Sequence, residues 1–167
     1  MEGDGVRVFT NEELEGIVLR YKDMVYRVAF THTRGPTEAD DVFQEVFLRY
    51  VRRAPDFTEE EHRKAWLLRV TANCCKKLRG SFWNKHTVSL SEAIPAQNEG
   101  EGELLELLDA LPEKYRSVLH LYYCEGYATD EIAAILGRRA ATVRSQLSRG
   151  RRCCGTRGKE RKTYDGT

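Results

Sequence analysis

Apolar residues recur at helical spacing along the first half of the chain. The first such stripe consists of Leu14, Ile17, Val18, Tyr21, Val25 and Val28. This spacing is typical of one face of an amphipathic helix. The pattern is interrupted at "TRGP" (33–36), resumes in "DDVFQEVFLRYV" (40–51), is interrupted again at "RRAPDF" (52–57) and resumes in "HRKAWLLRVTANCCKKLRG" (62–80). It therefore predicts one unit of three helices.

A threonine followed three residues later by an acid accompanies the start of each of these helices. The pairs are Thr10–Glu13, Thr37–Asp40 and Thr58–Glu61. In such a capping box the threonine hydroxyl accepts a hydrogen bond from the first turn, and the acid bonds back to the threonine N–H. We therefore predict a threonine cap at all three helix starts.

The segment "NKHTVSLSEAIPAQNEGEG" (84–102) lacks helical periodicity and is rich in Ser, Asn, Gly and acids, as flexible linkers are. Helical patterning resumes in "LLELLDALPEKYRSVLHLYYCEGY" (104–127), where Pro112 suits a first-turn position. Strand alternation and Asn-Gly hairpin signals are absent from the sequence. We predict an all-α chain of two small helical domains, residues 10–83 and 103–155, with an acidic linker at 84–102 and a basic tail at 156–167.

A helix-turn-helix is predicted within "DEIAAILGRRAATVRSQLSRGRRCC" (130–154). Ile132, Ile135 and Leu136 form one buried stripe, and Gly137 is placed to end that helix in a left-handed conformation. The next helix is expected to begin three or four residues later. Its packing seam comprises Val143, Leu147, Gly150 and Cys154, and its opposite side carries Arg144, Ser145, Ser148, Arg149 and Arg152. A polar outer face on the second helix is the layout that places side chains in a DNA groove.

Charge is sorted along the chain although the net charge is only +1. Residues 88–113 contain seven acids and no Lys or Arg, whereas residues 138–162 contain ten basic residues and a single acid, Glu160. A solvated helix would mix acids with its arginines to form i, i+4 pairs. The unmixed basic block instead indicates a polyanionic partner, and DNA is the economical choice.

Several function classes are disfavoured. No apolar run approaches the length of a membrane span, and "MEGDGVRVF" lacks a hydrophobic signal region, so a cytoplasmic location is expected. The sequence contains no phosphate-binding loop, no dinucleotide-binding motif and no zinc-protease motif, and its four histidines are scattered. We therefore expect no enzyme activity, no metal and no cofactor. The five cysteines lack C-x-x-C spacing and are expected to be reduced, inert thiols.

The residues from Leu108 to Cys154 resemble region 4 of the extracytoplasmic-function (ECF) sigma factors of the sigma-70 family. The shared elements include "LP" (111–112), "EGY" (125–127), "EIA" (131–133), "LG" (136–137) and "TVRS" (142–145). In the other half, "EADDVFQEVFLR" (38–49) is similar to the core-binding helix of region 2, and "AWLLRVTANCCKKLRG" (65–80) to its promoter-melting helix. The resemblance implies a sigma factor that binds core RNA polymerase and promoter DNA.

The resemblance also implies site residues for three partners. The coiled coil of the largest polymerase subunit would contact Asp41, Gln44, Glu45 and Leu48. The opened minus-ten strand would contact Phe57, Arg69, Asn73, Lys76 and Lys77, since basic residues with aromatic rings suit single-stranded DNA. The minus-thirty-five duplex would contact Arg139, Thr142, Arg144, Ser145, Ser148, Arg149 and Arg152. The C-terminal domain would also meet the polymerase flap, and an anti-sigma factor, which could hold the chain at the membrane, would cover the polymerase-binding surfaces.

Two stretches depart from the family pattern. "NCCKK" (73–77) leaves the minus-ten specificity unpredictable, and "RRAA" (138–141) adds positive charge that should strengthen binding more than it sharpens selection. The alternative interpretation is a stand-alone helix-turn-helix regulator. Such a regulator would need a self-complementary dimer interface, and the sequence shows no heptad or long apolar helix to supply it. Footprinting without polymerase would discriminate between the two.

Overall fold

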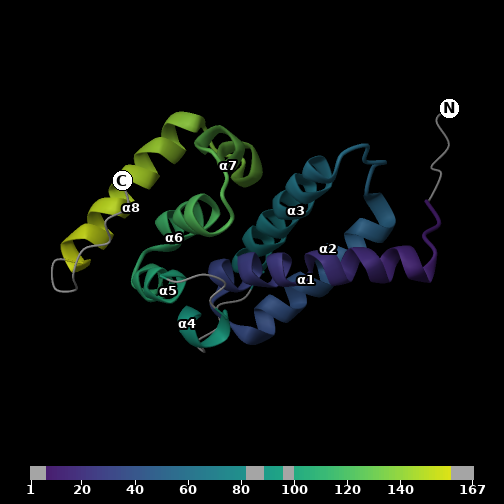
Figure 1. Cartoon of the computed structure of the whole chain (residues 1–167), viewed down its shortest axis with the longest axis horizontal. Helices are drawn as coiled ribbons and strands as arrows, with labels where there is room; N and C mark the ends of the chain where they lie inside the picture. The colour runs from purple at the N-terminus through teal and green to yellow at the C-terminus, as the bar shows by residue number, and fades with distance from the viewer. Residues whose placement is uncertain (1–6, 82–88, 96–99, 159–167) are drawn as a thin grey trace.

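Helices make up nearly all of the regular structure in the computed structural model, which describes residues 7–81, 89–95 and 100–158. Their order is α1 (Asn11–Thr33), α2 (Pro36–Arg53), α3 (Glu60–Ser81), α4 (Leu90–Ala93), α5 (Glu101–Asp109), α6 (Glu113–Leu119), the π-helical turn η1 (His120–Cys124), α7 (Thr129–Leu136) and α8 (Ala140–Gly158). The predicted all-α class with two helical domains is confirmed. Figure 1 shows α1–α3 beside the group formed by α5–α8, with α8 on the side farthest from α2.

One of the three predicted caps forms as expected. The Thr10 hydroxyl accepts from the Glu13 backbone N–H at 3.1 Å, and the Thr10 N–H donates to the Glu13 carboxylate at 3.0 Å. The prediction was wrong for Thr37, because α2 begins at Pro36 with Gly35 as a cap that makes no side-chain bond. Proline fixes φ for the first helical position, so the helix starts before the threonine. It was also wrong for Thr58, because α3 begins only at Glu60.

The segment predicted as a linker contains regular structure in its described part. Helix α4 lies within it, and α5 begins at its end, at Glu101. The Leu90 N–H donates to the carboxylate of Asp109 at 2.9 Å, which attaches α4 to the end of α5. Leu90 and Ile94 are buried, so this segment adds to the hydrophobic core. At the other end of the chain, α8 continues to Gly158, past residue 155, where the second domain was expected to end.

The second domain is built around the crossing of α6 and α8. Pro112 is the N-cap of α6, one position before the predicted first turn, and α6 continues into η1. Gly150 of α8 lies directly over Leu119 of α6, where a Cβ atom on residue 150 would be closer than 3.0 Å to the leucine side chain. The glycine therefore permits a close approach that any side chain would prevent.

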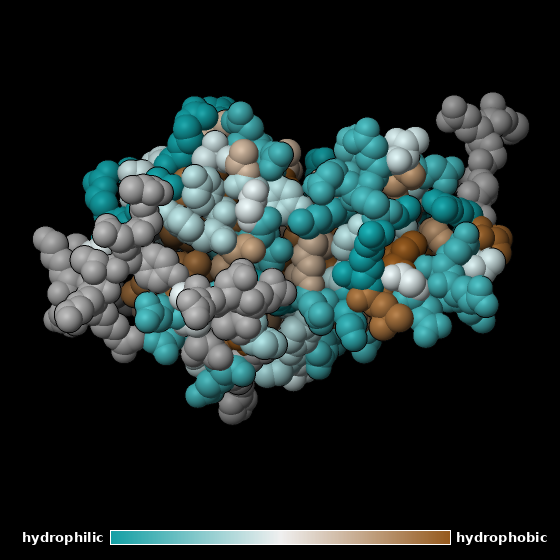
Figure 2. Space-filling model, viewed as in Figure 1, coloured by the Kyte–Doolittle hydropathy of each residue, from teal (hydrophilic) through white to brown (hydrophobic). Residues whose placement is uncertain are grey.

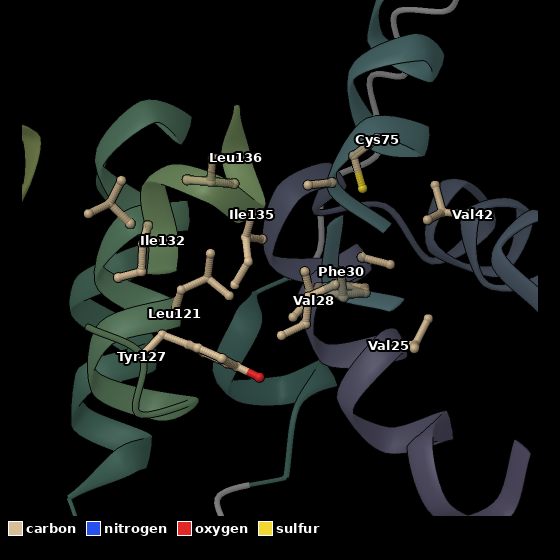
Figure 3. Packing of buried hydrophobic residues seen from close by; sticks show 14 of the residues in the cluster. Val25, Val28, Phe30, Val42, Cys75, Leu121, Tyr127, Ile132, Ile135 and Leu136 are labelled. Carbon is tan, nitrogen blue, oxygen red and sulfur yellow. The ribbon is translucent and has the colours of Figure 1, made fainter. Parts of the chain in front are cut away.

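The two domains share a continuous core. The C-terminal half of α1 is buried on all sides, from Arg27 to His32, because α2 and α3 cover part of it and the second domain covers the rest. Figure 3 shows Leu121 and Ile135 of the second domain near Val28 and Phe30 of α1. The face of the molecule seen in Figure 2 is mainly hydrophilic where its residues are coloured, with apolar residues in small separate patches. None of the described helices is both long enough and apolar enough to cross a bilayer.

Candidate nucleic-acid interface

Helices α7 and α8 form the predicted helix-turn-helix. Gly137 ends α7 with φ 64° and ψ 40°, the left-handed conformation expected for it, and its N–H donates to the Ala133 carbonyl. Helix α8 then begins at Ala140, close to the predicted start. Val143 and Leu147 of α8 are buried, which confirms the narrow packing seam. The turn and this seam together fix which side of α8 faces outward.

The outward side of α8, together with Arg139 in the turn before it, carries every residue predicted to contact the minus-thirty-five element. Exposed here are Arg139, Thr142, Arg144, Ser145, Ser148, Arg149 and Arg152. The Arg144 guanidinium lies 3.9 Å from an oxygen of Asp130, and both side chains are largely exposed. Such an exposed pair contributes at most about 1 kcal/mol, so a phosphate can readily displace the carboxylate. The face has the charge and the accessibility that a DNA groove requires.

Two further arginines of this basic block bind within the domain. Arg138 donates to the Lys114 carbonyl at 3.2 Å and to the Gln146 side chain at 3.0 Å. Arg151 donates to the Tyr123 hydroxyl at 2.7 Å, and its guanidinium lies over the Tyr122 ring, 5.2 Å from the centroid. The fold thus separates arginines that hold the domain together from those that face outward.

Helix α3 exposes four of the five residues predicted to contact the minus-ten strand: Arg69, Asn73, Lys76 and Lys77. The fifth, Phe57, is half-buried in an aromatic cluster with Tyr50 and Trp66, whose ring centroids lie 6.5 and 6.1 Å away. Leu67 is buried and Trp66 is half-buried against the core. The basic face of α3 is therefore displayed, whereas the Phe57 ring already has protein neighbours.

Helix α2 displays the residues predicted to contact polymerase. Asp41, Gln44 and Leu48 are exposed, and the leucine exposes 47% of its surface. Glu45 is half-buried and accepts a hydrogen bond from Arg49 at 2.8 Å, which lowers the pKa of its carboxyl. An exposed leucine among acids is typical of a helix-docking patch.

The predicted polymerase and minus-ten faces meet at a cavity of about 300 Å³ between α2 and α3. The lining residues are Asp41, Val42, Glu45, Arg49, Cys74, Lys77 and Leu78. Asp41 and Glu45 come from the predicted polymerase face, and Lys77 comes from the predicted minus-ten face. The tertiary structure thus joins two surfaces that the sequence could only describe separately.

Two of the five cysteines, Cys74 and Cys124, lie in surroundings that disfavour the thiolate. None of the five forms a disulfide, and Cys74 and Cys75 are buried. Burial raises the pKa of the Cys74 thiol and raises that of Cys124 to about 12. Because the thiolate is the reactive form, these environments disfavour oxidation and metal binding.

A cluster of buried charged residues between the two domains was missed by sequence reasoning. Arg27 of α1 pairs with Glu101 of α5, and its Nε lies 3.8 Å from the carboxylate of Glu125. These three side chains expose only 5%, 6% and 9% of their surface. The one signal in the sequence was an arginine within the nearly apolar stretch "VYRVAF" (25–30), which gives no indication of its partners.

His120 lies beside this cluster, with its Nε2 3.9 Å from Glu125. Burial, together with the nearby charges of Arg27 and His32, lowers the pKa of His120 to about 3. Burial has the opposite effect on the Glu125 carboxyl and raises its pKa. At neutral pH the histidine is therefore uncharged inside the fold.

Comparison with known proteins assigns both domains to one class. Residues 17–81 match the family "Sigma-70 region 2", and residues 101–154 match "Sigma-70, region 4". The order of these regions, the helix-turn-helix and the exposed faces of α2, α3 and α8 define a sigma factor fold.

Individual relatives agree with this assignment. The chain is 31% identical over 150 residues to the probable RNA polymerase sigma factor RfaY of Xanthomonas campestris, a match that covers 81% of this chain and 38% of RfaY. It is 29% identical to the ECF RNA polymerase sigma factor SigE of Mycolicibacterium smegmatis, over 81% of this chain and 57% of SigE. It is 28% identical to ECF sigma factor SigW of Bacillus subtilis, over 81% of this chain and 83% of SigW.

A solved structure shares the fold. Sigma factor RpoE of Bartonella quintana, crystallised with the anti-sigma factor NepR, superposes with a TM-score of 0.64 at 18% identity and covers 90% of this chain and 99% of RpoE. The chain belongs to the sigma-70 family. Within that family it is of the ECF type, as its relatives are. The chain spans 38% and 57% of the lengths of RfaY and SigE.

Proposed function

We propose that this chain binds core RNA polymerase and directs it to promoters as an ECF sigma factor. The observation that carries the proposal is the arginine- and serine-rich outer face of α8, which lies in a helix-turn-helix and in the sigma-70 region 4 of the chain. Family membership favours this function over a stand-alone regulator. The protein supplies positioning and strand separation in the cytoplasm, and the polymerase supplies the catalysis.

The α8 face is assigned to the minus-thirty-five duplex. Its arginines can bind guanine edges or phosphates in bidentate geometry, and its serines can donate to either. The logarithm of the binding constant falls linearly with the logarithm of the salt concentration, and each DNA phosphate that the protein neutralises adds about −0.9 to that slope. The exposed positions of Arg144 and Arg149 support this role.

The α3 face is assigned to the opened minus-ten strand. Arg69 and Asn73 lie one helical turn apart and are both exposed, so one side chain can bind a phosphate while the other binds a base edge. Unstacking a base step costs a few kcal/mol. Stacking on aromatic rings returns about 1–3 kcal/mol per base, which suffices to hold a short bubble open.

The α2 face is assigned to the coiled coil of the largest polymerase subunit, and the second domain to the polymerase flap. Leu48 supplies the apolar contact, and Asp41 and Glu45 supply charge around it. An anti-sigma factor is the proposed inhibitor of the same surfaces, since the related RpoE structure was determined with such a partner.

Transcription from a library of genomic fragments with purified core polymerase tests the function. Arg149→Ala should weaken binding to the upstream element and leave the affinity for core polymerase unchanged. Arg151→Ala is the matched control, because that arginine lies on the same helix but binds Tyr123. Loss of core binding in Arg149→Ala would show that the division of roles is wrong.

The polymerase face has its own test. Asp41→Lys with Glu45→Lys should weaken the affinity for core polymerase in a pull-down or by anisotropy. Glu12→Lys with Glu15→Lys reverses two exposed acids on α1 and is the control. Equal affinity of both double variants for core polymerase would refute the docking assignment.

A further inference from the structure

Gln146 is a polar residue of α8 that the residues assigned to the minus-thirty-five duplex do not include. It is half-buried and lies one helical turn after Thr142 and one turn before Arg149, both of which are exposed and belong to that assigned set. Because residues three and four positions apart lie on the same side of a helix, these three side chains form one strip along α8. Gln146 is therefore placed beside the proposed DNA contacts.

The side chain of Gln146 is bound by Arg138 in the turn of the helix-turn-helix. The Arg138 guanidinium donates to the Gln146 Oε1 atom at 3.0 Å and to the Lys114 carbonyl of α6 at 3.2 Å. Arg138 is itself half-buried. The arginine thus links the turn to both α6 and α8, so the amide that it binds is held in one orientation.

The chemistry of arginine determines which end of the amide is bound. A guanidinium has five N–H donors and no acceptor, so the atom of Gln146 that faces it must be the oxygen. The amide nitrogen has two N–H donors and no acceptor, and it is the end of the side chain left for a partner. In the folded domain Gln146 therefore presents donors, and its acceptor is engaged by Arg138.

A glutamine held in this way should select a different base from a glutamine that can turn. An unrestrained amide pairs with adenine in the major groove, because its oxygen accepts from N6 while its nitrogen donates to N7. A donor-only amide cannot make that pair. Guanine offers it two adjacent acceptors, O6 and N7, whereas thymine offers one, and adenine and cytosine each present an amino group that would face the amide N–H groups.

We propose that Gln146 reads a guanine in the minus-thirty-five element and that Arg138 is the positioning residue that restricts it to this base. The inference rests on the proposed function, because it takes α8 as the helix in the major groove. Guanine is selected by the amide N–H donors, and adenine is rejected because the amide oxygen is bound to Arg138. Arg138 thus acts on selectivity, whereas the sequence predicted that "RRAA" (138–141) adds mainly affinity.

Selection from a random DNA library tests both roles. The probe is a pool of duplexes of random sequence, from which the full-length chain selects with and without core polymerase, and the wild type should enrich guanine at one base pair. Gln146→Glu keeps an acceptor for Arg138 but has no amide donors, so it should enrich cytosine there, whose amino group donates. Arg138→Ala releases the Gln146 oxygen and should lower the ratio of guanine to adenine at that base pair about tenfold.

Arg139→Ala is the matched control for Arg138→Ala. It removes the same charge from the neighbouring position, where the side chain is exposed. Loss of a phosphate contact weakens binding about uniformly across sequences, so this variant should bind less tightly with unchanged base ratios. A folded Arg138→Ala protein with the wild-type ratio of guanine to adenine would overturn the positioning role.

Gln146→Glu decides the base contact even if Arg138→Ala does not fold, because this substitution retains the bond to Arg138. Unchanged base preference in Gln146→Glu, or a uniform loss of affinity, would overturn the proposal and indicate a phosphate contact instead. Guanine selection by the wild type only in the absence of core polymerase would retain the role of Gln146 and reject the sigma-factor function. A wild-type protein that selects no sequence in either setting would reject both.

Discussion

Gly150 is the position at which the smallest change in sequence should disturb the helix-turn-helix domain most. A Cβ atom there would be less than 3.0 Å from the Leu119 side chain and 3.3 Å from the Cβ of Tyr115. Leu119 is only 1% exposed, so its side chain cannot turn out into solvent. Gly150→Ala therefore forces α6 and α8 apart along their whole crossing.

Two opposing effects determine how much Gly150→Ala changes the free energy of unfolding. Alanine is favoured over glycine in a helix interior by about 1 kcal/mol. Overpacking of a well-filled core costs about 1–3 kcal/mol. The distance from the added Cβ atom to the Leu119 side chain would be much shorter than an ordinary van der Waals contact. We expect a net loss of about 1–2 kcal/mol in the free energy of unfolding. Gly155→Ala, on the same helix with nothing within 4 Å, should instead gain about 0.5–1 kcal/mol.

Urea titration followed by far-UV circular dichroism provides the comparison. The Leu119→Ala variant and the Leu119→Ala, Gly150→Ala double variant complete a double-mutant cycle. Gly150→Ala should cost less stability in the Leu119→Ala background than in the wild type, because the leucine side chain that clashes with the new Cβ atom is gone. Equal stability of Gly150→Ala and Gly155→Ala would refute the close approach of α6 and α8. Full additivity in the cycle would show that Leu119 is not the obstructing group.

Three further outcomes are expected. Thr10→Ala removes the capping box of α1 and should lower the free energy of unfolding by about 1 kcal/mol in urea titrations. Gly137→Ala places a Cβ at a φ of 64° and should cost about 1–2 kcal/mol, whereas Gly137→Asn should cost less, in the same assay. His120 has a pKa of about 3 in the fold and 6.5 as its reference, so the unfolded chain binds more protons and the stability due to this group falls as the pH drops below 6.5. His120→Gln should remove from that slope about 0.7 kcal/mol per pH unit at pH 6.5, rising to about 1.4 kcal/mol per pH unit near pH 5, and the raised pKa of Glu125, which acts in the opposite direction, is common to both proteins.

Local patterns in the sequence sufficed to predict the buried and exposed faces of individual helices. The spacing of apolar positions along α8 correctly separated Val143 and Leu147, which are buried, from Arg144 and Arg149, which are exposed. The left-handed end of α7 at Gly137 was equally predictable, because few other residues adopt that conformation. These features depend on residues within one or two helical turns, so the information is local.

Local rules failed where two of them competed. Thr37 carried a capping pattern, but Pro36 fixed the start of α2 one residue earlier. The 84–102 segment has the composition of a linker, yet Leu90 and Ile94 are buried. The Asp109 carboxylate at the end of α5 accepts from the Leu90 N–H at the start of α4. The composition of a segment shows how polar it is. It does not show whether another part of the fold covers its few apolar residues.

The contact between the domains was decided by the tertiary structure alone. Helical periodicity indicates which side of a helix is buried, but a buried charge needs a partner, and the partner of Arg27 is Glu101, 74 positions along the chain. The same holds for Lys76, which the sequence presents as a free cation and which the fold places on the end of α7. The sequence thus determined the helices, their outward faces and the family of the protein. Only the packed structure determined that the two units proposed to face DNA lie together, because that arrangement depends on charges paired across distant segments.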